Sequence, residues 1–444
     1  MAACFGVFLA AVAVCLATSH SLIWALPLGL VLFFILGLRR GFSAREMASM
    51  AWGKGRESLI VVPVFLLIGT VTALWRSSGT IAFFLYYGLR SISPSWFILM
   101  TFLLCTALSF ALGTSFGVVG TAGVVLITLA RSGGVDLSIT AGAIISGAYF
   151  GDRCSPMSSC ATLVAACTQT PLYSNIREML KTALLPTALT AVIFVALSLQ
   201  NPISSVDNGI LTILSNGFAL GWQVLLPAAL VFLLPLLKVP IKWALAASAA
   251  AALAVTVLLQ GQSVPGALRI AVCGYQPVQP ELRDILSGGG LCSMLSCGAV
   301  VFITSLYAGI LGGIDALAPA RGEAAQLAEK LGRFPAAVIV STMIAAIFCN
   351  QSVVVLMDEQ LLADSYKTQG ASSTELAIDI ANSGVVIAGL VPWSIASAVP
   401  LSTLDVGMEA IPCCVLLYMI PLCYLFTKRY FQAGQNRPVL AERT

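Results

Sequence analysis

Charged residues are scarce in this 444-residue sequence: 23 Lys and Arg plus 19 Asp and Glu amount to 9%, whereas 59% of the residues are hydrophobic. Soluble domains carry roughly 25% charged residues. So few charges cannot cover a water-facing surface, which excludes a cytosolic enzyme, a nucleic-acid-binding protein and a disordered chain. The composition therefore predicts a polytopic protein whose main partner is the lipid bilayer.

Histidine is nearly absent, because His20 is the only one, and the 13 cysteines show no zinc-binding spacing. Cysteines such as Cys105, Cys349 and Cys423 lie inside apolar runs and are interpreted as buried packing residues. The sequence also lacks a Walker loop, an HExxH motif and a GxSxG motif. We therefore expect no enzyme, no ATP-driven pump and no cofactor.

Long apolar runs predict an all-α fold with about 10–12 transmembrane helices, because about 20 apolar residues cross a bilayer. The candidate spans are residues 4–18, 21–38, 58–75, 95–112, 117–131, 138–150, 183–200, 222–238, 241–260, 290–312, 335–357 and 409–427. The segments 80–92, 153–168 and 384–404 are apolar but short or broken. They predict re-entrant pieces.

Two basic segments predict the orientation. Residues 39–57 are interpreted as a loop rich in Arg and Lys, including Lys54, and the tail after Thr427 contains Lys428, Arg429, Arg437 and Arg443. Short basic segments stay on the cytoplasmic side of a membrane. We therefore expect both termini in the cytoplasm.

The two halves of the sequence repeat an order of features. An apolar run broken at LGTSFGVVGTAG precedes YFGDRCSPMSSCAT, and STMIAAIFCNQSVVVLM precedes ANSGVVIAGLVPWSIAS. Matching interruptions are typical of transporters with two inverted repeats, although coincidence among Gly-rich segments is the alternative. We divide the chain into 1–57 (helical hairpin and basic cytoplasmic loop), 58–205 (first transport repeat), 206–285 (connecting spans), 286–408 (second transport repeat) and 409–444 (last span and basic cytoplasmic tail).

Asp152 is the principal candidate for the transport site. Asp152 and Arg153 are the only charged residues between Asp136 and Arg177. A carboxylate at membrane depth is costly unless it faces protein or water, and it can then exchange a proton for a cation. Gly151 and Pro156 are expected to break the helix there and free carbonyl groups for Na⁺. The alternative is a solvated loop at the membrane surface.

Other polar interruptions point to the same kind of site. The break at Gly113–Gly117 would aim half-helix ends at a substrate, or would only allow close helix packing. The amides of Asn350 and Gln351 either bond a neighbouring helix or line the site. Asp358 and Glu359 are a second candidate titrating pair, but we favour a solvated helix end. Residues 380–404 predict a re-entrant hairpin, in which Trp393 could alternatively anchor at the interface.

These segments resemble the NhaC family of Na⁺/H⁺ antiporters, within the ion transporter superfamily. The resemblance rests on GTSFGVVGTAGVVLI (113–127), SGAYFGDRCSPMSSCATLVA (146–165), FCNQ (348–351) and LVPWSIASA (390–398), and extends over nearly all of the chain beyond about residue 20. It implies a secondary transporter that works by alternating access in the bacterial inner (plasma) membrane, with Na⁺ and H⁺ as coupling ions. The superfamily often functions as a homodimer, which the sequence itself does not establish.

The polar interruptions and the resemblance together give the candidate site residues. Asp152 would exchange the proton and the cation, and Asp152, Thr114 and Ser155 are the candidate Na⁺ ligands. The candidate substrate-binding residues are Gly113, Thr114, Ser115, Gly117, Ser155, Pro156, Ser158, Ser159, Asn350, Gln351, Asn382, Ser383, Gly384, Trp393 and Ser394.

The sequence departs from the family pattern where the family tends to have carboxylates. Ser159 stands where an Asp is common, Ala381-Asn382 replaces a Glu-Asp pair, and Ser394 stands where an Asn is common. The family resemblance makes Na⁺/H⁺ antiport the first hypothesis. The loss of carboxylates makes exchange or symport of a small organic acid (malate or lactate type) or an amino acid the second. A non-transporting membrane protein or a membrane enzyme is the third.

Overall fold

The computed structural model describes residues 6–8, 10–11, 14–15, 25–59, 62–91, 94–202, 208–237, 239–314 and 318–435. Most of the expected first span at 4–18, His20, Arg437 and Arg443 lie outside the described residues. Within them the chain is helical, apart from one isolated β-bridge between Tyr275 and Gly288. The expected all-α membrane fold is confirmed.

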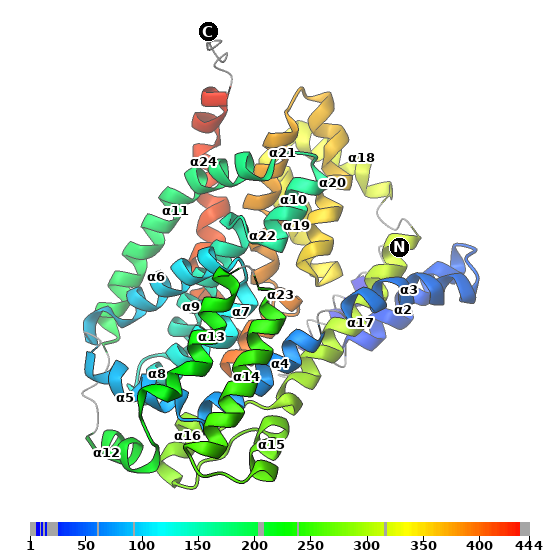
Figure 1. The fold of residues 1–444 in the computed structure, drawn as a ribbon. Helices are drawn as coiled ribbons and strands as arrows, with labels where there is room; N and C mark the ends of the chain where they lie inside the picture. The colour runs from blue at the N-terminus through cyan, green and yellow to red at the C-terminus, as the bar shows by residue number, and fades with distance from the viewer. Residues whose placement is uncertain are drawn as a thin grey trace.

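The helices fall into four consecutive groups (Figure 1). The N-terminal pair is α2 (Ala25–Arg39) and α3 (Ala44–Ser58). The first repeat contains α4 (Val62–Ser77), α5 (Thr80–Ser91), η2 (Pro94–Trp96), α6 (Phe97–Leu112), α7 (Ser115–Val118), the π-helical turn η3 (Val119–Gly123), α8 (Val124–Ser132), α9 (Leu137–Cys154), α10 (Ser159–Cys167) and α11 (Leu172–Gln200).

The connecting group contains α12 (Asn208–Gly217), η4 (Trp222–Leu225), α13 (Leu226–Leu236), α14 (Ile241–Leu258), α15 (Val264–Cys273), η5 (Pro280–Leu282), α16 (Arg283–Leu286) and η6 (Leu291–Met294). The second repeat contains α17 (Leu295–Gly313), α18 (Ala318–Leu331), α19 (Arg333–Phe348), α20 (Gln351–Thr368), α21 (Ser373–Asn382), α22 (Gly384–Ile387), η7 (Ala388–Leu390), α23 (Ile395–Leu404), η8 (Met408–Cys413) and α24 (Val415–Gln435).

A single sequence offset relates the two repeats. The helix caps Thr114 and Asn350 are 236 residues apart (350 − 114), and the caps Ser158 and Ser394 are separated by the same number. This offset superposes the bounds of α6 on α19, of α7–α8 on α20, and of α9 on α21–η7. It also pairs α11 with η8 and α24. The spacing therefore favours a second repeat that includes α24, whereas the domain limits themselves stay a prediction.

Both repeats break their helices in the same way. Gly113 ends α6 and Cys349 ends α19 in the left-handed conformation, with φ of 66° and 55°. Extended residues then restart the chain, and their side chains accept hydrogen bonds from the next helix: Thr114 from Gly117 N, and Asn350 from Ser352 N and Val353 N. Such caps satisfy backbone groups that would be costly to leave unpaired in a membrane.

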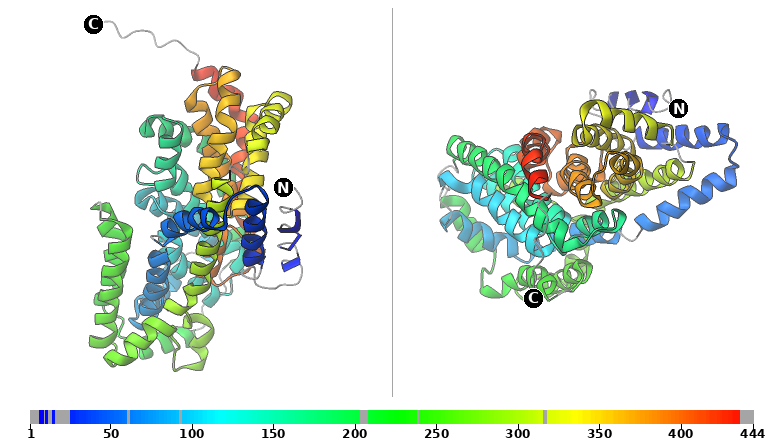
Figure 2. Two further views of the ribbon diagram at one scale, coloured as in Figure 1. Left: turned by 90° about the vertical axis from the view of Figure 1, so that its right-hand side faces the viewer. Right: turned by 90° about the horizontal axis from the view of Figure 1, so that it is seen from above.

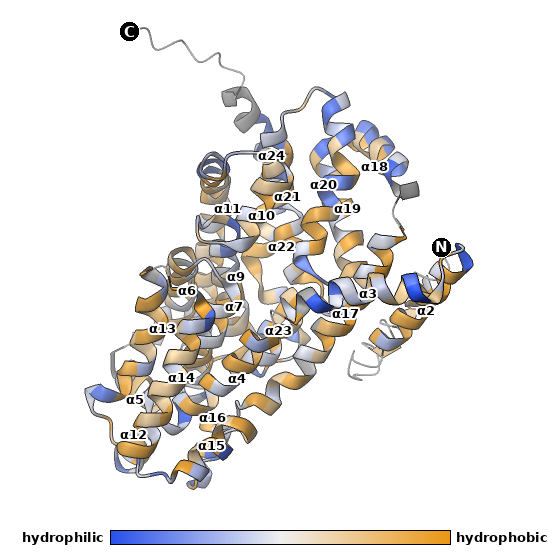
Figure 3. Cartoon of the chain, turned by 45° about the vertical axis from the view of Figure 1, so that its right-hand side comes forward, coloured by the Kyte–Doolittle hydropathy of each residue, from blue (hydrophilic) through white to orange (hydrophobic). Residues whose placement is uncertain are grey.

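These breaks leave few uninterrupted spans among the described residues. Four helices are long and apolar enough to cross a membrane, at Ser115–Ser132, Leu172–Gln200, Ile241–Leu258 and Leu291–Gly313. Two further pairs are bent, Val62–Ser77 with Thr80–Gly88 by 63° and Ser373–Leu390 with Ile395–Leu404 by 48°. In Figure 3 most helices are hydrophobic, and hydrophilic residues gather on α3 and α18.

The basic segment 39–57 is mostly helix α3 rather than the expected loop. Figures 1 and 2 show α2 and α3 on one flank of the molecule, and α3 packs against α17. Gly309 of α17 makes this close approach feasible, because a Cβ there would lie 3.0 Å from Lys54 Cβ. Side chains of α3 therefore point toward the second repeat as well as toward water.

Gly113 provides a test of the first break. A Cβ at this position would lie 2.5 Å from the Met157 carbonyl carbon and 2.7 Å from Ser158 N, and φ is positive. We expect Gly113→Ala to lower the free energy of unfolding by about 1–3 kcal/mol through strain. The measurement is the thermal unfolding midpoint in detergent. Gly312→Ala in α17 is the matched control, because nothing lies within 4 Å of its added Cβ; an equal loss of stability in both variants would contradict the strain argument.

Candidate functional site

Three segments surround the Asp152 carboxylate. Asp152 lies two residues before the end of α9 and is 6% exposed. Ser115 Oγ, directly after the first break, donates to Asp152 Oδ2 at 3.2 Å, and Ser158 Oγ lies 3.4 Å from Oδ1. The Gln351 side chain from the second break lies next to the carboxylate. The site thus joins both repeats around one acid.

The hairpin between α9 and α10 and the one between η7 and α23 each fold back against the break of their own repeat. Gly113 abuts Met157 and Ser158 at the first tip. At the second tip, Ile395 N donates to Cys349 O at 2.8 Å and Trp393 Nε1 donates to Ala346 O at 2.8 Å. These bonds satisfy carbonyls near the end of α19 and fix Trp393 at the hairpin tip.

The two repeats meet directly beside Asp152. Tyr149 OH in α9 donates to Ala396 O in α23 at 2.5 Å and so joins the repeats. Within the second repeat, Gln351 Nε2 in α20 donates to Val385 O in α22 at 2.8 Å. Figure 1 places α7, α9, α22 and α23 together near the centre of the molecule. Asp152 is therefore an interior group, and the alternative of a solvated surface loop is wrong.

A cavity of about 450 Å³ lies next to this site. Its polar lining combines hydroxyls, amides and one ammonium group: Ser159, Ser305, Ser352, Asn350, Gln351 and Lys54. The rest of its lining is apolar, from Phe65, Phe116, Leu163, Ala308, Val353, Leu356, Ile395 and Ala396. Gln351 both lines the cavity and contacts Asp152, so it connects the two. Among the described residues, no carboxylate belongs to this lining.

The remaining predicted residues have mainly structural contacts. Thr114 and Ser394 cap helices, Pro156 and Gly117 lie within the first hairpin and the first break, and Ser155 Oγ accepts from Met157 N at 3.2 Å. Their roles in binding stay predictions. Gly151 does not end its helix as expected, because α9 continues to Cys154; its lack of a side chain instead lets α9 pack against Ser109 of α6.

Comparison with known proteins identifies the chain. The sequence model of the Na⁺/H⁺ antiporter family matches residues 1–158 and 147–428. The chain belongs to this Na⁺/H⁺ antiporter family. It is similar to a malate-2H⁺/Na⁺-lactate antiporter of Bacillus subtilis, with 27% identity over 456 aligned residues that cover 99% of this chain and 96% of the relative. It is also similar to the Na⁺/H⁺ antiporter NhaC of Alkalihalophilus pseudofirmus, with 27% identity, covering 81% of this chain and 80% of the relative.

A further relative is an uncharacterized Na⁺/H⁺ antiporter of Haemophilus influenzae, 29% identical, covering 81% of this chain and 79% of the relative. The expected resemblance to NhaC and the expected secondary antiport are confirmed. The protein is an integral membrane antiporter, and its relatives are antiporters rather than enzymes.

Arg153 of this antiporter points away from the Asp152 carboxylate. It is 1% exposed and donates to Thr182 Oγ1 at 2.6 Å and to Asn382 Oδ1. Asn382 therefore binds Arg153 instead of Asp152. Ser383 contacts Ser341, and Gly384 lies against Asp358. The guanidinium is held by neutral side chains of α11 and α21, which leaves the carboxylate without a basic partner among the described residues.

Asp358 contradicts the prediction of a solvated helix end. It has no exposed surface, and its Oδ2 lies 2.6 Å from Ser341 Oγ of α19. Its Oδ1 is buried without a hydrogen-bond partner. The sequence indicated Asp358 as a candidate titrating residue but did not indicate that it is buried. We expected the helix to end near this acid, whereas α20 continues ten residues beyond it.

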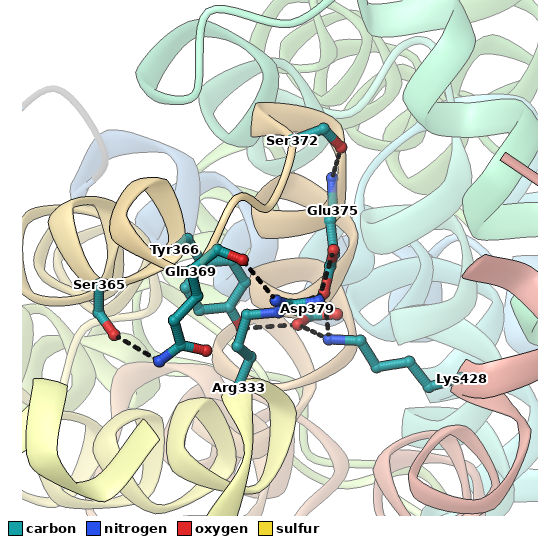
Figure 4. Close-up of polar contacts among 8 residues, drawn as sticks. All are labelled: Arg333, Ser365, Tyr366, Gln369, Ser372, Glu375, Asp379 and Lys428. Atoms are coloured by element: carbon teal, nitrogen blue, oxygen red, sulfur yellow. Dashed lines mark hydrogen bonds and ion pairs between the residues drawn. The ribbon is translucent and has the colours of Figure 1, made fainter. Parts of the chain in front are cut away.

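An ion cluster that the sequence did not predict joins α24 to α19, α20 and α21 (Figure 4). Lys428 pairs with Asp379, and its Nζ lies 2.8 Å from Glu375 Oε1. Glu375 also pairs with Arg333 Nε at 2.8 Å, and Tyr366 OH donates to Asp379 Oδ2 at 2.6 Å. Lys428 is thus a buried residue of α24 and not part of a basic tail. Glu375 and Asp379 are four residues apart, and this spacing on one helix face was the feature of the sequence that could have indicated the cluster.

Lys428 allows a test of this cluster. We expect Lys428→Met to cost roughly 3–5 kcal/mol of stability, because it leaves the Asp379 carboxylate buried without its cation. The measurement is the thermal unfolding midpoint in detergent. Arg429→Met, an exposed neighbour in the same helix, is the control and should change little. Adding Asp379→Asn to Lys428→Met should recover part of the loss; no recovery would mean that the pair is not the source of the stability.

Proposed function

We propose that this antiporter exchanges Na⁺ for protons at Asp152. The observation that carries the proposal is the convergence of Ser115, Ser158 and Gln351 on one buried carboxylate from two broken helices and a hairpin tip. Hydroxyl, amide and backbone oxygens together with a carboxylate are ligands that a hard cation prefers. The same carboxylate binds a proton when the cation leaves.

Competition between the two ions explains exchange. Burial disfavours a bare carboxylate, so Asp152 is expected to carry either a proton or a cation when it is shielded from water. If only these two loaded forms permit the change between inward-open and outward-open conformations, each cation moved one way requires protons moved the other way. The hairpin tips are the parts that would move, because they pack on the breaks through few backbone bonds.

The wider setting forms part of the same proposal. Na⁺ and H⁺ would be the coupling ions, and no cofactor would be needed. The protein would lie in the bacterial inner membrane with both termini in the cytoplasm, the two repeats would be inverted relative to each other, and a homodimer would be the functional unit. Exposed Arg45 and Arg56 on α3 support the cytoplasmic side for this helix.

Asp152→Asn tests the exchange site. We expect the variant to lose Na⁺-dependent proton movement in proteoliposomes, because an amide cannot release a proton or neutralise Na⁺. The measurement is the internal pH of vesicles after a Na⁺ jump. Asp136→Asn is the control, since Asp136 is exposed and caps α9, a role that Asn also fills. Undiminished exchange in Asp152→Asn would remove this acid from the mechanism.

Exchange of a small organic acid is the second candidate, and the cavity favours it. A space of about 450 Å³ falls within the roughly 300–1,000 Å³ typical of small-molecule sites and exceeds what a bare ion needs. Its ammonium group, amides and hydroxyls, with no carboxylate in the lining, suit an anion. Ser159, where the family tends to have Asp, is one of these hydroxyls. The similarity to a malate/lactate antiporter supports this candidate.

Lys54→Met tests the organic-acid candidate. Counterflow of labelled malate or lactate should be measurable with the wild-type protein. The variant should raise the KM by about tenfold or more, because a charge-assisted hydrogen bond contributes about 1.5–3 kcal/mol. Arg45→Met, exposed on the same helix, is the control. Absence of counterflow with a panel of small acids would leave Na⁺/H⁺ exchange as the function.

A further inference from the structure

Asp358 lies inside the second repeat, where α20 packs against α19 and α22. Its side chain has no exposed surface, and a Cβ on Gly384 of α22 would collide with Asp358 Oδ2. The glycine thus leaves the space that the carboxyl group occupies. An acid enclosed so closely must be neutral or must be paired with a positive charge, because an isolated buried charge is too costly.

A short hydrogen-bonded chain leads away from this carboxyl group. Asp358 Oδ2 and Ser341 Oγ are 2.6 Å apart, Ser341 Oγ and Ser383 Oγ are 3.0 Å apart, and Ser383 Oγ donates to Asp379 O at 2.7 Å. These three contacts need three protons, and each serine hydroxyl supplies one. Ser383 uses its proton on Asp379 O. Ser341 Oγ has the geometry to donate to either Asp358 Oδ2 or Ser383 Oγ, but it has a single proton. All three contacts are hydrogen bonds at once when Ser341 donates to Ser383 and a protonated Asp358 donates to Ser341.

The surrounding charges agree with a neutral acid. On α21 the acids Glu375 and Asp379 are engaged by Lys428 and Arg333. On α10 the thiol of Cys167 is close enough to Asp358 and Glu359 to interact with them electrostatically. The charged residues of α18 that face water are Arg321, Glu323, Glu329 and Lys330, and those on α20 itself are Glu359, Asp364 and Lys367. No cation among the described residues pairs with Asp358.

The interface between α20 and α22 connects Asp358 to the exchange site at Asp152. Gln351 and Asp358 are seven residues apart on α20, which is two turns on one helix face and about 10 Å. Gln351 contacts Asp152 and bonds Val385 O of α22, while Asp358 lies against Gly384 of α22. One interface, between α20 and α22, therefore connects the two acids.

We propose that Asp358 is a second proton-binding site of this antiporter, occupied by a proton in the present conformation and emptied during the exchange cycle. Separation of α20 from α22 would admit water, remove the desolvation cost of the carboxylate and break the serine chain that holds the proton. The proposal rests on the proposed proton antiport at Asp152. It adds one proton per cycle to the proton that Asp152 exchanges for Na⁺.

Two measurements on the full-length protein test the site. Infrared difference spectroscopy should show a carboxylic-acid C=O band at neutral pH that is lost in Asp358→Asn and kept in Asp364→Asn, an exposed acid of the same helix. In proteoliposomes, the reversal potential of exchange should shift in Asp358→Asn as expected for one proton fewer per cycle, while Asp364→Asn keeps the wild-type ratio.

Ser383→Ala keeps the acid and provides a second test if Asp358→Asn does not fold. Without Ser383 as an acceptor, Ser341 can donate to the carboxylate and stabilise the charged form. The pH at which the infrared band disappears should therefore fall in this variant. An unchanged band in either variant, or a wild-type reversal potential in Asp358→Asn, would overturn the proposal. Absence of any proton exchange by the wild-type protein would refute the antiport instead, since the infrared band does not depend on transport.

Discussion

Interrupted helices at membrane depth must find partners for their backbone groups, and the rest of this structure depends on how they do so. Thr114 and Asn350 cap the restarted helices, Ser158 and Ser394 cap the helices after the hairpin tips, and Ile395 N reaches across to a carbonyl of the second break. Lipid offers no such partners. Each hairpin is therefore tied to the break of its own repeat, which fixes where the polar groups of the site can be.

The two repeats share their backbone plan but not their acids. The residue that the offset pairs with Asp152 is Ala388, and the one it pairs with Asp358 is Ala122. One carboxyl group thus lies at a hairpin end of the first repeat and the other in the middle of a helix of the second repeat. The two repeats have similar helix bounds and breaks, and the placement of the acids makes the two halves chemically different.

Basic residues that look like signals of orientation also reach into the protein. Lys54 comes from the basic segment before the first repeat and lines the cavity. Lys428 comes from the end of the last helix and pairs with buried acids of α21. Long lysine side chains can reach a polar group several ångströms from their own backbone, so position near a helix end does not show where the charge lies.

The sequence by itself determined the class of protein and the breaks at Gly113 and Asn350, and it singled out Asp152 as the candidate exchange site. These follow from local information: low charge, apolar run length, and the glycines, prolines and capping residues that end helices. The order of the four motifs along the chain is also local information, and it is sufficient to indicate the family.

Only the tertiary structure decided which polar groups share a neighbourhood. Gln351 lies next to Asp152, whereas Asn382 binds Arg153. Ser383 belongs to the series of hydrogen bonds that leads through Ser341 to Asp358. A helix one turn longer or shorter changes whether an acid is solvated, and sequence periodicity does not set the ends of α20 so finely. The burial of Asp358 and Lys428 depends on contacts between segments that are distant in the chain, and local sequence contains no record of those contacts.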